Sequence, residues 1–90
     1  MRLQNKIAII TGSSRGIGAA TAKLFAQEGA KVVVQYKENK TAAEKVFRSL
    51  AGNGHILLRA DVSKENEVVK LVEAVIEKYN RIDILVNNAG

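Results

Sequence analysis

The sequence predicts an α/β fold in which alternating strands and helices build a doubly wound parallel sheet. Four short apolar runs recur about every 25 residues, at 7–10, 32–34, 56–58 and 84–86. Each run is continuous rather than alternating, which is typical of parallel strands covered on both faces. Segments with helical periodicity separate the runs, so the expected order is β-α-β-α-β-α-β. Right-handed crossovers favour the spatial order 3-2-1-4 within one domain, residues 1–90.

The three helices are predicted from apolar faces and from residues typical of helix ends. The first ends at Gly29, and its predicted buried face consists of Ile17, Ala20, Thr21, Leu24 and Glu28. The second follows a capping box formed by Thr41 and Glu44. The third follows an N-cap at Ser63, and its apolar stripe consists of Val68, Val72, Val75, Ile76 and Tyr79.

Composition excludes several classes of protein. The 90 residues include 14 basic and 9 acidic side chains, no cysteine and one histidine, so disulfides and a histidine–cysteine metal cluster are excluded. His55 is expected to be an exposed loop residue. No apolar run is long enough to span a membrane, and four aromatic residues do not make a stacking platform for nucleic acid. We therefore expect a cytoplasmic protein that binds neither nucleic acid nor membrane.

The strand at 7–10 runs directly into Thr-Gly-Ser-Ser-Arg-Gly-Ile-Gly at residues 11–18, and a helix begins within that stretch. Gly12 turns the chain, Gly16 lets a pyrophosphate approach the backbone, and Gly18 lets the helix pack close to the strand. Free N–H groups at the helix start then form an anion site. Arg15 and the hydroxyls of Ser13 and Ser14 are expected to add to it.

The spacing of these glycines is neither the common G-x-G-x-x-G pattern nor a Walker loop. The pattern Thr-Gly-x-x-x-Gly-x-Gly resembles that of the short-chain dehydrogenase/reductase family. Asp61-Val62 and Asn87-Asn88-Ala89-Gly90 also match that family, nearest to its 3-oxoacyl-carrier-protein reductase type. The resemblance implies the N-terminal half of a Rossmann-like fold, the cofactor-binding half of an oxidoreductase that reduces a carbonyl or oxidises an alcohol.

The resemblance also implies roles for individual residues. Gly12, Ser13, Ser14, Arg15, Gly16, Ile17 and Gly18 would surround the cofactor diphosphate. The Asp61 side chain would meet the adenine amino group beside the backbone of Val62, although the residues alone leave open that Asp61 caps the third helix. Asn88, Ala89 and Gly90 would pass close to the ribose.

The end of the second strand bears on the choice of cofactor. Tyr36 stands where an NAD-specific site carries a carboxylate, and Lys37 follows it. Lys37 and Arg15 could neutralise a 2′-phosphate through charge-assisted hydrogen bonds. The sequence therefore favours NADP(H) as cofactor, with NAD(H) as the alternative.

Catalysis in the family resembles general-acid work by a Tyr-x-x-x-Lys pair with a serine upstream. Tyr36 and Lys40 match that spacing, but they stand too early in the chain to take the role, so no catalytic residue is assigned and the 90 residues alone are expected to be inactive. A dinucleotide-binding module without catalysis is one alternative. An S-adenosylmethionine methyltransferase fragment is another, although it would need an acid at Tyr36. An uncovered sheet face and edge strand predict self-association.

Overall fold

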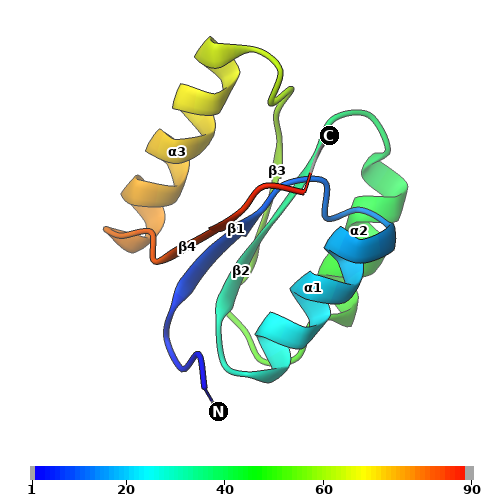
Figure 1. The fold of residues 1–90 in the computed structure, drawn as a ribbon, viewed down its shortest axis with the longest axis vertical. Coiled ribbons are helices and arrows are strands. Elements are labelled where there is room, and N and C mark those ends of the chain that lie inside the picture. The colour runs from blue at the N-terminus through cyan, green and yellow to red at the C-terminus, as the bar shows by residue number, and fades with distance from the viewer. Residues whose placement is uncertain (1, 89–90) are drawn as a thin grey trace.

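The computed structural model describes residues 2–88, which form four parallel strands and three helices. The strands are β1 (Ile7–Ile10), β2 (Lys31–Tyr36), β3 (Ile56–Arg59) and β4 (Ile84–Val86). They lie in the order β3-β2-β1-β4, with all pairs parallel, and their carboxyl ends share one edge of the sheet (Figure 1). The predicted fold class and strand order are confirmed.

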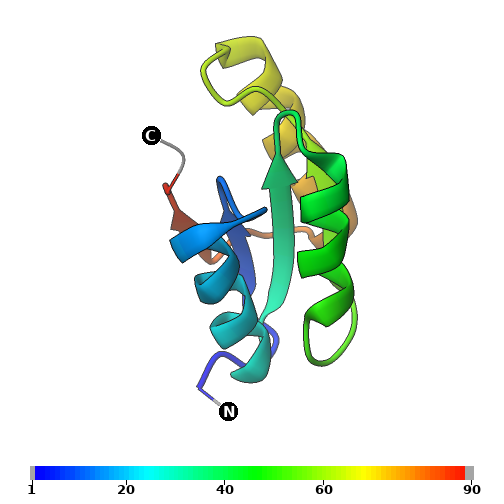
Figure 2. The same ribbon diagram turned by 90° about the vertical axis from the view of Figure 1, so that its right-hand side faces the viewer.

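The helices cover the two faces of the sheet unequally. Helices α1 (Gly16–Gln27) and α2 (Lys40–Ser49) lie on one face, and α3 (Glu65–Tyr79) lies on the other (Figures 1 and 2). Since side chains alternate along a strand, β1 sends Ala8 and Ile10 toward the α1–α2 side and Ile7 and Ile9 toward the α3 side. The result is one core cluster on each face, as expected for strands buried on both sides.

The buried face of α1 differs from the prediction. Gly18, Ala22 and Ala26 are the buried residues, whereas Ile17 is 77% exposed and Leu24 is 55% exposed. The three buried residues are small and recur at intervals of four, so they allow the helix backbone to lie close to the sheet. The sequence prediction chose the larger apolar side chains, which point away from this close contact. Gly29 ends the helix as predicted, with φ of 94°.

Helix α3 is rotated relative to its predicted stripe. Its buried residues are Leu71 and Val75, while Val72 and Ile76 remain 37% and 41% exposed. Tyr79 packs against the α3-side cluster, and its hydroxyl donates to the carbonyl of Gly54. The helix ends at Asn80, whose φ of 63° places it in the left-handed region.

Both predicted N-caps are wrong. Helix α2 is capped by Asn39, two residues before Thr41; the side-chain oxygen of Asn39 accepts from the N–H of Ala42 at 3.0 Å. Lys64 stands at the N-cap of α3 without a side-chain hydrogen bond, because the Ser63 hydroxyl donates to Asp61 instead.

His55 is half-buried and holds two segments together, so its prediction as an exposed loop residue is wrong. Its Nδ1 accepts from the N–H of Val32 at 3.0 Å, and its Nε2 lies 2.7 Å from the carbonyl oxygen of Ala51. The register of β2 and β3 begins with Val33 opposite Ile56, so Val32 has no strand partner on that side. The imidazole takes the place of that partner.

Asp83 fastens the amino end of the sheet. Its Oδ2 accepts from the N–H of Ile7 at 2.9 Å, and its own N–H donates to the Ile7 carbonyl at 2.9 Å. Arg81 donates to Oδ1 at 2.6 Å. The hydrogen bond from Arg81 and the one from Ile7 hold the pKa of Asp83 below its usual value. This carboxylate therefore links the start of β1 to the start of β4.

Among residues 2–88, no helix combines the length and the apolar character that crossing a membrane requires.

Candidate functional site

The glycine-rich loop lies at the carboxyl edge of the sheet, between β1 and α1 (Figure 2). Gly12 and Gly16 have φ of 64° and 58°, which lie in the left-handed region that favours glycine. Helix α1 starts at Gly16, within the stretch 11–18 as predicted, and Arg15 stands exposed at its N-cap without a capping hydrogen bond. The bend is therefore made by backbone conformation and is not filled by a capping side chain.

The backbone N–H groups of residues 14–18 have no acceptor within the described part of the chain. The first turn of a helix leaves its N–H groups without intrahelical partners, and the helix dipole makes this end electropositive. Ile17, which carries one of these N–H groups, has an exposed side chain, as do its neighbours Arg15 and Gly16. This arrangement can hold an anion without help from side chains.

Gly18 shows why α1 begins so close to β1. A Cβ atom built on Gly18 would lie 2.3 Å from the carbonyl oxygen of Gly12 and 2.7 Å from Nδ2 of Asn88. A Cβ on Gly16 would meet no atom within 4 Å. Gly18 is thus required for close packing, whereas Gly16 leaves open space next to the free N–H groups.

Asn88 and Thr11 attach the end of β4 to the loop. The Asn88 side chain donates to the carbonyl oxygen of Gly12 at 3.2 Å, and its backbone N–H donates to Thr11 Oγ1 at 2.9 Å. Thr11 is buried, and its own N–H donates to the Val86 carbonyl at 3.0 Å. Two further site predictions, Ala89 and Gly90, lie outside the described residues.

The Ser13 hydroxyl does not face the anion corner as predicted. Ser13 is fully buried, and its Oγ accepts from the N–H of Gln35 at 2.9 Å and donates to the Gln35 carbonyl at 3.4 Å. Its hydrogen bonds are therefore directed at β2. Ser14 is half-buried and, like Arg15, has no hydrogen bond from its side chain to another described residue.

Gln35 is the residue of this region that the sequence reasoning missed. It is 2% exposed; its Oε1 accepts from the N–H of Gly12 at 2.7 Å, and its Nε2 donates to the carbonyl of Ala60 at 2.6 Å. The signal was present in the sequence, because a single amide directly follows the apolar run Val-Val-Val within β2. A polar side chain in such a run must find partners when it is buried.

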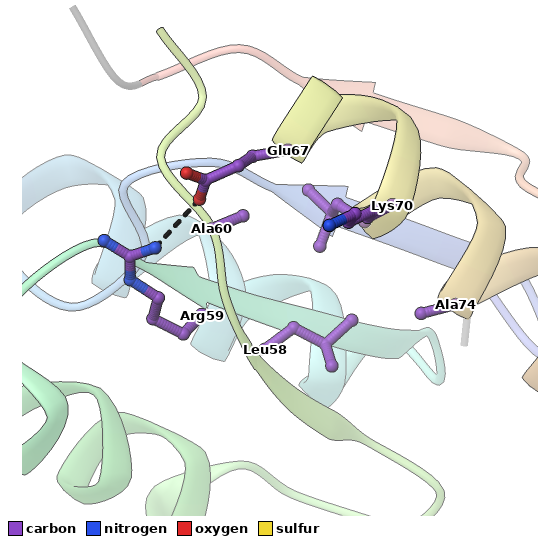
Figure 3. A pocket seen from close by; sticks show the side chains of 7 residues that line it. Leu58, Arg59, Ala60, Glu67, Lys70 and Ala74 are labelled. Carbon is purple, nitrogen blue, oxygen red and sulfur yellow. Dashed lines mark hydrogen bonds and ion pairs between the residues drawn. The ribbon is translucent and has the colours of Figure 1, made fainter. Parts of the chain in front are cut away.

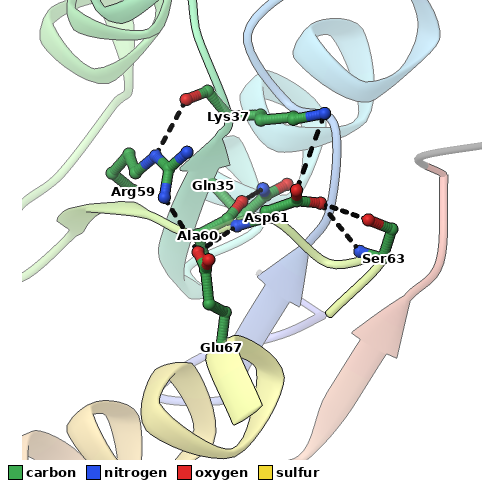
Figure 4. A network of polar contacts seen from close by, with 7 residues as sticks. All are labelled: Gln35, Lys37, Arg59, Ala60, Asp61, Ser63 and Glu67. Atoms are coloured by element: carbon green, nitrogen blue, oxygen red, sulfur yellow. Dashed lines mark hydrogen bonds and ion pairs between the residues drawn. The ribbon is translucent and has the colours of Figure 1, made fainter. Parts of the chain in front are cut away.

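Asp61 follows β3 at the same edge of the sheet, and a network of polar contacts surrounds it (Figure 4). It is 7% exposed and accepts from the N–H and the hydroxyl of Ser63 at 3.0 and 2.6 Å. Lys37 Nζ lies 3.6 Å from its Oδ2. The Ser63 hydrogen bonds, helped by Lys37 and Lys64, hold the pKa of Asp61 below its usual value, so it is a carboxylate at neutral pH.

Glu67 completes this network from the first turn of α3. Its Oε1 accepts from the N–H of Asp61 and from Arg59 Nη1, both at 2.8 Å, while Arg59 Nε donates to the carbonyl of Lys37 at 3.0 Å. Neither Glu67 nor Arg59 is among the predicted site residues, because nothing in their spacing along the chain distinguishes them from other surface charges. Together they fix the backbone on which Asp61 and Lys37 stand.

Three more of the predicted site residues lie near this network in the chain. Tyr36 ends β2 and packs against the α1–α2 side of the core, Lys37 follows it with a half-exposed side chain, and Val62 is half-buried after Asp61. Lys40 is the first residue of α2, so Tyr36 and Lys40 do not share a helix. Their spacing does not reproduce a Tyr-x-x-x-Lys pair on successive helical turns.

A shallow pocket of about 120 Å³ opens between β3 and α3, beside the Arg59–Glu67 ion pair (Figure 3). Leu58, Ala60 and Ala74 supply much of its apolar wall. Ligand pockets usually measure about 300–1,000 Å³, so this hollow is too small for a dinucleotide. Among residues 2–88 no group of histidine or carboxylate side chains could hold a metal ion.

Comparisons with known proteins agree with this geometry. A model of the short chain dehydrogenase family matches residues 6–90. A 3-oxoacyl-[acyl-carrier-protein] reductase of Synechocystis sp. is 46% identical over 90 residues, which cover 98% of this chain and 36% of that protein. An uncharacterised oxidoreductase of Methylorubrum extorquens is 45% identical over 91 residues, covering 99% of this chain and 37% of the relative.

The solved structure of a mutant short-chain dehydrogenase/reductase from Serratia marcescens superimposes with a TM-score of 0.92 at 37% identity, and the match covers all of this chain and 38% of that one. The chain thus spans little more than a third of the length of these relatives. The family model, however, spans nearly all of the 90 residues. On the strength of the matched residues and the shared fold, the chain belongs to the short-chain dehydrogenase family.

Proposed function

We propose that this chain is the cofactor-binding part of an NADP(H)-dependent oxidoreductase that interconverts a carbonyl and an alcohol. The observation that carries the proposal is the set of free N–H groups at residues 14–18, at the same edge of the sheet as Asp61 and Lys37. In open α/β sheets, ligands bind at the carboxyl edge of the strands. A diphosphate would bind the N–H groups, and the adenosine would extend toward Asp61.

The proposed preference for NADP(H) rests on charge. Lys37 has a half-exposed side chain whose nearest described anion is Asp61, 3.6 Å away, and no carboxylate occupies the end of β2. A 2′-phosphate would offer Lys37 a doubly charged partner, while Arg15 stands exposed at the N-cap of α1. Asp61 would then be free to accept from the adenine amino group.

Titration of the chain with NADPH, NADH and S-adenosylmethionine tests this proposal. NADPH is expected to bind most tightly, and Lys37→Glu is expected to weaken NADPH by at least about 10-fold while changing NADH less, since a charged hydrogen bond is lost and a repulsion gained. Lys78→Glu makes the same charge change at the far end of α3 and should affect neither. Equal losses of NADPH and NADH affinity in Lys37→Glu would refute the 2′-phosphate assignment.

We propose that the proton donor of the reaction does not lie in these 90 residues. Tyr36 belongs to a strand, and Tyr79 donates its hydroxyl hydrogen to Gly54 while burial raises its pKa, so neither suits general-acid catalysis near neutral pH. The chain alone should therefore bind NADPH without turnover. Carbonyl reduction by the 90 residues that is lost in Tyr36→Phe would contradict this assignment.

We also predict that the 90-residue chain associates with itself. Leu85, which pairs with Ile9 and so faces the α3 side, is 65% exposed, and Val69 and Ile76 of α3 are 49% and 41% exposed. Apolar surface beside an unpaired edge strand favours pairing with a second copy. Light scattering should detect dimers or larger species at micromolar concentration, and Leu85→Lys should reduce their mass. A monomer at these concentrations would contradict the prediction.

A further inference from the structure

A single buried amide connects the two ends of the proposed dinucleotide site. The side-chain oxygen of Gln35 accepts from the N–H of Gly12, which begins the anion loop. Its side-chain nitrogen donates to the carbonyl of Ala60, which directly precedes Asp61 (Figure 4). Both distances, 2.7 and 2.6 Å, are short for hydrogen bonds of this kind. The central strand β2 thus reaches the neighbouring segments on both of its sides at once.

The backbone of Gln35 strengthens the same connection. Its N–H donates to Ser13 Oγ at 2.9 Å, and its carbonyl accepts from the N–H of Ser13 at 3.3 Å. Two consecutive loop residues are therefore attached to this one position of β2. The N–H groups of residues 14–18, which follow immediately, have no such attachments of their own within the described chain.

We infer that Gln35 is a positioning residue, which sets the placement of the diphosphate N–H groups relative to Asp61 and so determines how well one dinucleotide can bind both. The inference rests on the proposed function. An apolar side chain of similar size would fill the space but leave the N–H of Gly12 and the carbonyl of Ala60 without these partners. Ser13 and Ala60 would remain bonded to β2 through the backbone of Gln35 and the carbonyl of Tyr36, but the direct side-chain bridge between Gly12 and Ala60 would be lost and the spacing of the two segments less strictly fixed.

Two substitutions at this position separate positioning from packing. Gln35→Met keeps the volume and removes both hydrogen bonds. Gln35→Glu replaces the amide by a carboxyl group that, when protonated, supplies one donor and one acceptor as the amide does, but only acceptors when ionised. Burial raises the pKa of such a carboxyl, and the charged groups around it are Lys37, Arg59, Asp61 and Glu67.

The NADPH affinity of each variant is measured between about pH 5 and 8 and divided by the wild-type affinity at the same pH. This ratio cancels the effect of titrating the ligand phosphate. Circular dichroism verifies that each variant is folded. We expect Gln35→Met to bind about 10-fold more weakly at every pH. Gln35→Glu should bind within about 2-fold of wild type at low pH and lose affinity as the pH rises. Such a pH-dependent rescue is not expected from a packing role.

Val33→Ala is the matched control. Val33 is fully buried two residues earlier on the same strand, in the α3-side core cluster, and its apolar side chain cannot hydrogen-bond to the loop. Its truncation should therefore lower stability without loss of NADPH affinity in the folded fraction. Folded Gln35→Met that binds NADPH as wild type does would overturn the inference and leave the proposed function standing. Failure of the wild-type chain to bind NADPH at any pH would instead overturn the proposed function and this inference with it.

Discussion

Gly18→Ala is expected to abolish NADPH binding and to lower the free energy of unfolding by about 2–3 kcal/mol. The new Cβ would lie 2.3 Å from a backbone oxygen, that of Gly12, so relief requires the helix to move away from β1. That movement would displace the N–H groups of the first turn from their positions in the proposed diphosphate site. Urea unfolding and NADPH titration on the same sample measure the two effects.

Gly16→Asn is the counterpart of this substitution. Asparagine tolerates the left-handed backbone of Gly16, and its Cβ would meet nothing within 4 Å. Its cost in stability should therefore be smaller than that of Gly18→Ala. NADPH binding should still weaken, since the new side chain occupies space beside the N–H groups. If Gly18→Ala instead unfolded and bound NADPH as the wild-type chain does, the contact between α1 and β1 would be looser than described.

Asp83→Ala is expected to lower the melting temperature by about 5–10 °C at pH 7. The buried N–H of Ile7 loses its side-chain acceptor, and Arg81 loses the carboxylate that it contacts at 2.6 Å. Glu73→Ala, which removes an exposed carboxylate with no hydrogen bond to another described residue, should change the melting temperature much less.

The pH dependence of the melting temperature provides an independent measurement of how much the Asp83 carboxylate stabilises the fold. In the folded protein, the pKa values of Asp83 and Asp61 both lie below the usual aspartate pKa. Each carboxylate therefore stabilises the fold fully at pH values above the unfolded-state pKa of about 3.9. This stabilisation is lost as the pH falls through the pKa of the folded state. Melting temperatures should therefore fall below about pH 4. Asp83→Asn should show a shallower decline, and an unchanged acid profile would contradict the role given to this carboxylate.

The strands and their order follow from sequence because continuous apolar runs between helical segments leave few arrangements of a parallel sheet. Gly12 and Gly18 could likewise be assigned, since a sharp bend and a close helix contact each need glycine. The buried face of α1 could not be assigned from apolar character, because the proximity of the helix to β1 selects Ala22 and Ala26 over the larger Ile17 and Leu24.

The polar contacts of the candidate site were harder to predict for a related reason. The hydrogen-bond partners of Gln35 and Ser13 lie more than 20 residues away in the chain, and those of Glu67 lie across a loop. The sequence spacing does not indicate which residues these partners are. A lone glutamine that directly follows a valine run in a buried strand does indicate a buried hydrogen-bonded group. Which backbone groups it satisfies depends on the register of three strands, which only the folded structure supplies.

The contact between Asn88 and Thr11 joins residues 77 positions apart in the chain. During synthesis from the N-terminus, the glycine loop leaves the ribosome early, whereas the side chain that holds the Gly12 carbonyl emerges near the end of this segment. The anion corner therefore matures only after β4 has docked against β1. A nascent chain that stops short of Asn88 should leave the Gly12 carbonyl without this side-chain donor, so completion of the corner is coupled to the docking of β4.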